Sequence, residues 1–128
     1  YFAFYSSPRG TGNQGEMDIW LLDLQDQTSR PIIDDPGHQS NAMFSPDGRW
    51  FAYQSDESGE WEIYVRPFPD ASAGRWQVSS AGGTEPHWSR DGTELYYRDG
   101  DGGVRNTGGF RLTRDLDERG RIVRFWCG

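Results

Sequence analysis

The sequence contains no lysine, so all 13 of its basic residues are arginine. A protein-kinase catalytic domain, a phosphate-binding P-loop and a Schiff-base enzyme each need a positioned lysine, which excludes all three from these residues. The single cysteine, Cys127, excludes a disulfide within the chain. No apolar run approaches the ~18 residues that cross a bilayer, so we expect no membrane insertion by this segment.

Basic residues are scarce over most of the chain. Residues 1–103 carry 17 acidic residues and 7 arginines, a net charge of −10, whereas residues 104–128 carry 3 acidic residues and 6 arginines, a net charge of +3. An acidic surface repels the phosphates of nucleic acid, so no nucleic-acid partner is expected. The change of sign marks residues 104–128 as a divergent basic tail.

Histidine is also scarce, which leaves little material for a catalytic or metal site. His38 and His87 are the only two, and there is no G-x-S-x-G nucleophile elbow. Two histidines without a cysteine cluster do not suit zinc, and Asp99-Gly100-Asp101 lacks the spaced ligands of an EF-hand loop. Residues 10–15 fit G-x-G-x-x-G, but a strand rather than a helix is predicted after them. The sequence therefore predicts no catalytic, cofactor-binding or metal-ligating residue, no cofactor and no enzyme activity.

Glycine, proline and aromatic residues are plentiful, and they are placed as in short strands joined by tight turns. The segment Ser45-Pro46-Asp47-Gly48 lies between two aromatic stretches and has proline and glycine at positions that suit a β-turn. The pattern returns 44 residues later. An Asp side chain in such a turn bonds nearby backbone amides. We predict structural turns at Ser45, Pro46, Asp47, Gly48, Ser89, Asp91 and Gly92.

Other segments repeat with similar spacing. Residues 2–6 resemble residues 51–55, and residues 18–21 resemble residues 62–65. A period of ~40–45 residues with several short strands per unit indicates the blades of a β-propeller. The middle strands are apolar on both faces, as expected where a sheet is covered by a neighbour on each side.

We therefore predict an all-β fold, a β-propeller fragment of about two and a half four-stranded antiparallel blades. A partial blade covers residues 1–33, a full blade residues 40–79 and a second partial blade residues 84–103, before the tail of residues 104–128. Closed propellers have ~4–8 blades, so we expect a piece of a longer protein, with further blades of the parent chain as partners. Alone, it is expected to be poorly stable, to associate or to form an open arc.

These motifs resemble the TolB-like, WD40-like β-propeller repeat (PD40-type) family. The segments that carry the resemblance are Phe44-Ser45-Pro46-Asp47-Gly48-Arg49, Glu62-Ile63-Tyr64-Val65 and Gly83-Thr84-Glu85-Pro86-His87-Trp88-Ser89-Arg90-Asp91-Gly92. Residues 64–69 and 76–79 are similar to propellers attached to bacterial Ser/Thr protein kinases. The resemblance covers about residues 1–100.

The resemblance implies a non-catalytic ligand- or protein-binding module, like a bacterial extracytoplasmic sensor or a TolB-like scaffold, and a periplasmic or extracytoplasmic location. The alternatives are the gating propeller of a prolyl-oligopeptidase-like serine peptidase whose hydrolase domain is absent here, or a fragment of a degraded gene. A downstream G-x-S-x-G segment in the parent gene favours the peptidase, whereas a transmembrane helix with a lysine-bearing kinase domain favours the sensor. Propeller inner strands line a central channel, so Asn41, Glu85 and His87 are predicted to face it and to bind a protein or small-molecule ligand.

Overall fold

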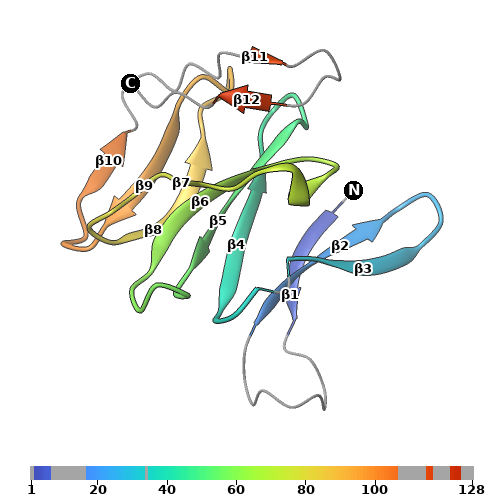
Figure 1. Cartoon of the computed structure of the whole chain (residues 1–128), viewed down its shortest axis with the longest axis horizontal. Helices are drawn as coiled ribbons and strands as arrows, with labels where there is room; N and C mark the ends of the chain where they lie inside the picture. The colour runs from blue at the N-terminus through green and yellow to red at the C-terminus, as the bar shows by residue number, and fades with distance from the viewer. Residues whose placement is uncertain (1, 7–16, 34, 107–114, 117–121, 125–128) are drawn as a thin grey trace.

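The computed structural model consists of β-strands joined by turns and short loops (Figure 1). It describes residues 2–6, 17–33, 35–106, 115–116 and 122–124. Within these residues there is no α-helix. One short 3₁₀-helix, η1 (Ala71–Ala73), lies between residues 67 and 76. The predicted all-β class is confirmed.

The strands form three antiparallel sheets and one hairpin. The first sheet has the order β1 (Phe2–Ser6), β2 (Asp18–Asp23), β3 (Thr28–Ile33). The second has the order β4 (Gln39–Phe44), β5 (Trp50–Ser55), β6 (Glu62–Pro67), β7 (Trp76–Gln77). The third has the order β8 (Gly83–Trp88), β9 (Leu95–Asp99), β10 (Val104–Asn106), and the hairpin pairs β11 (Asp115–Leu116) with β12 (Ile122–Arg124).

The three sheets lie side by side, with the second in the middle (Figure 1). The second and third sheets are built alike, because Gln39 lies opposite Ser55 in one and Gly83 lies opposite Asp99 in the other, 44 residues further on. β10 comes from the residues that the sequence assigned to the basic tail, and it pairs with β9. The third sheet therefore continues to Asn106.

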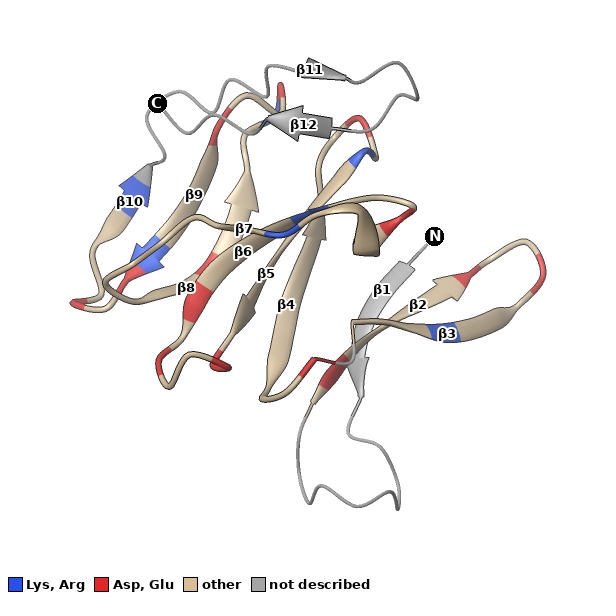
Figure 2. Ribbon diagram, in the orientation of Figure 1, with Lys and Arg blue, Asp and Glu red and all other residues tan. Residues whose placement is uncertain are grey.

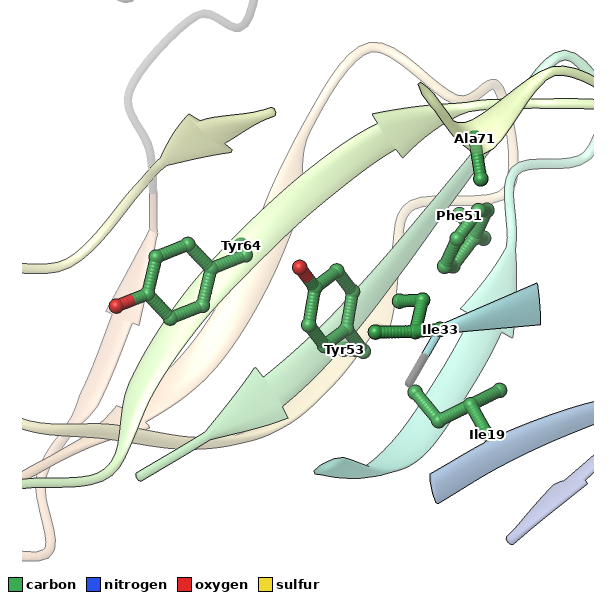
Figure 3. Close-up of a cluster of buried hydrophobic side chains, with 6 residues drawn as sticks. All are labelled: Ile19, Ile33, Phe51, Tyr53, Tyr64 and Ala71. Atoms are coloured by element: carbon green, nitrogen blue, oxygen red, sulfur yellow. The ribbon is translucent and has the colours of Figure 1, made fainter. Parts of the chain in front are cut away.

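Both faces of the second sheet are buried, and β5 is buried along its whole length. One face packs against the first sheet through six buried side chains shown in Figure 3: Ile19, Ile33, Phe51, Tyr53, Tyr64 and Ala71. The other face packs against the third sheet in a second cluster: Trp50, Ala52, Ile63, Val65 and Leu95. Fully burying one large apolar side chain stabilises a fold by about 1.5–3 kcal/mol. Contacts on both sides therefore explain why the middle strands lack a polar face.

An ion pair ties the loop before β4 to the second sheet. Arg66 pairs with Asp35, and its Nε donates to the Tyr53 hydroxyl at 3.0 Å. Burial raises the pKa of Tyr53 to about 12, although the Arg66 hydrogen bond and charge oppose the rise. Tyr53 is therefore a neutral member of the core at physiological pH. Most acidic residues, by contrast, lie in loops and hairpin turns (Figure 2).

Candidate functional site

The three residues predicted to face a channel lie on the first strands of the second and third sheets. Asn41 is in β4, Glu85 and His87 are in β8, and all three are exposed. They line one pocket of about 380 Å³, which we call the inner-strand pocket. The rest of its wall is formed by Ala42, Met43 and Pro86. The fold thus brings the three polar side chains together where two sheets meet.

Each of these two strands has a bulge at the inner-strand pocket. The register of β4 against β5 shifts around Asn41, and that of β8 against β9 shifts around Glu85. Asn41 has a φ of 53° and Glu85 a φ of 55°, a region that residues with side chains rarely adopt. Glu85 is the more unusual, because a residue before proline is biased towards extended backbone. Backbone strain of this kind clusters at functional sites.

Gln54 holds both bulges in place. Its Oε1 accepts from Nδ2 of Asn41 and from the backbone N of Glu85, each at 2.9 Å. In the third sheet Arg98 takes the position equivalent to Gln54, and its Nε donates to the Glu85 carboxylate at 3.0 Å. Neither Gln54 nor Arg98 was predicted as a site residue. Gln54 and Arg98 are 44 residues apart, the period of the repeat, and lie on the strands that pair with the bulged strands. That spacing could have identified them from the sequence.

β4 and β8 are also joined directly. The indole Nε1 of Trp88 donates to the backbone O of Met43 at 3.0 Å. Together with the Gln54 bonds, this contact fixes the separation of the two pocket walls. A preformed pocket binds with a smaller loss of entropy than one that must order on binding.

We expect Gln54→Leu to lower the free energy of unfolding by about 1–3 kcal/mol, because it leaves the backbone N–H of Glu85 without its acceptor. Leucine is close to glutamine in size, so the loss reports the hydrogen bonds rather than a cavity. Urea unfolding followed by circular dichroism measures it. Gln25→Leu, in an exposed turn, is the matched control and should change stability by less than about 0.5 kcal/mol. Equal stability of the two variants would contradict the bridging role of Gln54.

The first predicted turn is closed by its own side chains. The Ser45 Oγ donates to the Asp47 carboxylate at 2.6 Å and accepts from the backbone N of Trp50 at 3.1 Å. The backbone N of Gly48 donates to the Ser45 O at 2.9 Å, and Gly48 has a φ of 69°. The Ser45 hydroxyl is thus engaged within the turn.

The second predicted turn repeats the same bonds. The Ser89 Oγ donates to the Asp91 carboxylate at 2.7 Å and accepts from the backbone N of Glu94 at 3.0 Å. The two turns also lie against each other, because a Cβ added at Gly92 would be 3.3 Å from the Cδ of Pro46. The repeat therefore places equivalent corners of neighbouring sheets at the same level.

The second turn predicts a measurable pH dependence. Hydrogen bonds from the Ser89 hydroxyl and then from the Thr93 hydroxyl and amide lower the pKa of Asp91 to about 2. Since an unfolded Asp has a pKa of ~3.9, the stabilising effect is present above that pH and is lost as the pH falls through about 2. An NMR titration of the Asp91 carboxyl carbon should give this low midpoint, and Thr93→Val should raise it. A wild-type midpoint of ~4 would contradict the bonds.

The other candidate residues bond within loops. The Nδ1 of His38 accepts from the backbone N of Met17 at 3.3 Å. The Asp99 carboxylate accepts from the backbone N of Gly103 at 2.8 Å and from the Nε of Arg105 at 2.6 Å. In the described part of the chain no three His, Cys, Asp or Glu residues are grouped so as to hold a metal ion. The glycine-rich motif at residues 10–15 lies outside the described residues.

Most of the chain matches a known family. The family model described as the TolB beta propeller domain, PD40, matches residues 10–119 of the chain. That range includes both turns, both bulges and all six residues of the inner-strand pocket. No described helix has the length and apolar character needed to cross a membrane.

Solved structures share the arrangement of strands. A TolB from Acinetobacter baumannii is 20% identical, with a TM-score of 0.61, over 88% of this chain and 30% of that one. A putative TolB from Agrobacterium tumefaciens is 22% identical, with a TM-score of 0.58, over 70% of this chain and 40% of that one. An uncharacterized protein of Agrobacterium fabrum, Atu1656, is 27% identical over 106 residues, which are 83% of this chain and 34% of that protein. The chain thus spans about a third of the length of these relatives. The family match and the solved structures confirm the predicted propeller fold.

Proposed function

Because the chain belongs to the family of TolB β-propeller domains, we propose that it is a non-catalytic binding module that holds a polypeptide ligand on β4 and β8. The observation that carries the proposal is the inner-strand pocket, in which two equivalent bulges place Asn41, Glu85 and His87 around one hollow. Asn41 of β4 meets Glu85 and His87 of β8 there because two sheets lie side by side.

The lining of the inner-strand pocket suits a peptide. The Asn41 carboxamide both donates and accepts, the Glu85 carboxylate accepts, and the His87 imidazole offers one of each when neutral. Met43 and Pro86 supply apolar surface next to these polar groups. A peptide offers amides, carbonyls and apolar side chains in alternation, which matches this mixture.

The turns support a non-catalytic role. A serine nucleophile needs a base to take its proton and an oxyanion hole beside it. Ser45 and Ser89 instead donate to the carboxylates of their own turns and accept from backbone amides. The hydroxyls therefore stabilise hairpins.

The parent protein is proposed to be a bacterial extracytoplasmic sensor or a TolB-like scaffold, with further blades of the same chain beside these sheets. The matched parts make up only 30–40% of these relatives, which supports the additional blades. A lysine-bearing kinase domain and a transmembrane helix in the parent gene would support the sensor. A G-x-S-x-G segment there would favour the gating propeller of a serine peptidase instead.

The test is selection of phage-displayed linear peptides on the immobilised chain. Enriched peptides are expected to bind the wild type and to lose at least tenfold in affinity for Glu85→Gln/His87→Ala. The matched control is Arg30→Ala, an exposed residue of β3 in the first sheet. Peptides that bind all three proteins equally, or no enrichment over the blank surface, would contradict a peptide site at the inner-strand pocket.

A further inference from the structure

The turn between β5 and β6 closes the seam between the first two sheets. The Oδ1 of Asp56 accepts from the backbone N of His38 at 2.7 Å, and its own backbone N donates to the His38 O at 3.2 Å. A Cβ added at Gly37 would lie 2.7 Å from the same Oδ1. The Asp56 side chain thus fills this seam.

At the equivalent place between the second and third sheets no side chain intervenes. The paired registers make Gly82 equivalent to His38 and Gly100 equivalent to Asp56. Without a side chain at Gly100 the two backbones touch, and a Cβ added at Gly82 would lie 2.8 Å from the Gly100 Cα. A hollow of about 580 Å³ opens beside this contact, which we call the seam pocket.

We propose that the seam pocket binds the arginine side chain of a protein partner. It is lined by Trp61, which is half-buried, by the exposed residues Glu60 and Asp101, and to a large extent by glycine. Its described lining contains no basic side chain. A guanidinium group stacks on an aromatic face and donates to carboxylates in a planar fork, so it uses each of these groups.

A metal ion fits the seam pocket less well. The third carboxylate of the lining, Asp99, already accepts from Gly103 and pairs with Arg105. Of the carboxylates in the described lining, only those of Glu60 and Asp101 are then available as metal ligands. Calcium takes ~6–8 oxygen ligands at short range, so two carboxylates suit it poorly. The volume suits a long side chain, and the neighbouring Trp61 gives it an apolar surface. The seam pocket shares no residue with the inner-strand pocket, so the two proposals stand separately.

The experiment titrates the ¹⁵N-labelled chain at low salt with the peptide acetyl-Gly-Arg-Gly-amide and with its citrulline analogue, which has the same shape without the charge. We expect the arginine peptide to shift the amide signals of residues 60–61, 82–84 and 100–102. The variant Glu60→Gln/Asp101→Asn should weaken binding about fivefold, since two exposed charge contacts are lost. The control Asp26→Asn/Glu94→Gln removes the same charge outside the seam pocket and should bind as the wild type does.

Three results would overturn the assignment. The first is equal binding by the pocket variant and the control, which would mean that general charge attracts the peptide. The second is equal binding of the citrulline peptide, which would mean that the guanidinium charge is not recognised. The third is the absence of shifts at the seam-pocket amides. A failure to select peptides at the inner-strand pocket would not affect these measurements, because the titration changes Glu60 and Asp101, which do not line that pocket.

Discussion

Trp50→Ala is expected to lower the free energy of unfolding by about 3–5 kcal/mol. Trp50 is 3% exposed and faces the third sheet, where it belongs to the same buried cluster as Ile63 and Leu95. Its ring meets that of Trp76 edge to face, with centroids 5.6 Å apart and an interplanar angle of 70°. Alanine removes both sets of contacts and leaves a cavity that the two sheets cannot close without shifting against each other.

Urea unfolding followed by far-ultraviolet circular dichroism measures the effect, because a tryptophan variant also changes fluorescence. Leu24→Ala is the control, since Leu24 is 62% exposed and its loss should change stability by less than about 0.5 kcal/mol. The Trp50 variant could also lack the circular dichroism signal of β-sheet before urea is added. That result would agree with a large loss of stability. A change below about 1 kcal/mol would mean that the second and third sheets are not packed together.

The positions of the strands could be predicted because the repeat marks their ends with turn residues. The aromatic stretch that follows the predicted Asp47-Gly48 turn is β5, Trp50–Ser55. β4 begins at Gln39, one residue before the predicted start of the full blade at residue 40, and apolar patterning does not show why. The Nε2 of Gln39 donates to the backbone O of Asp35 and of Pro36, each at 3.0 Å, so a polar residue is buried at the start of the strand.

The two pockets were less accessible to sequence reasoning, because each depends on contacts between sheets. The positive φ of Glu85 opposes the preference imposed by Pro86, and it is held by Gln54, which lies 31 residues away in the chain. The replacement of Asp56 by Gly100 at the equivalent position is readable from the repeat. That it opens a hollow depends on the backbone contact with Gly82.

Glu62→Ala is expected to lower the free energy of unfolding by about 2–4 kcal/mol, because it leaves two donors near the second seam without an acceptor. Glu62 is 3% exposed at the start of β6. Its carboxylate accepts from the Ser79 hydroxyl and, at 3.0 Å, from the backbone N of Gly82. The Ser79 Oγ in turn accepts from the backbone N of Ile63 at 2.8 Å. One side chain therefore anchors the crossover that carries the chain from the second sheet to the third.

Glu62→Gln separates the hydrogen bonds from the volume of the side chain. Its amide oxygen still accepts from Gly82, whereas its amide nitrogen forces the Ser79 hydroxyl to find another acceptor. We therefore expect this variant to lose about half of what Glu62→Ala loses in the same urea titration. If Glu62→Gln and Glu62→Ala lose the same stability, hydrogen bonds that glutamine retains do not contribute to it. Full stability of Glu62→Ala would mean that the crossover at residues 79–83 is held by backbone pairing, chiefly the bond from the Gly83 N to the Trp61 O at 2.7 Å.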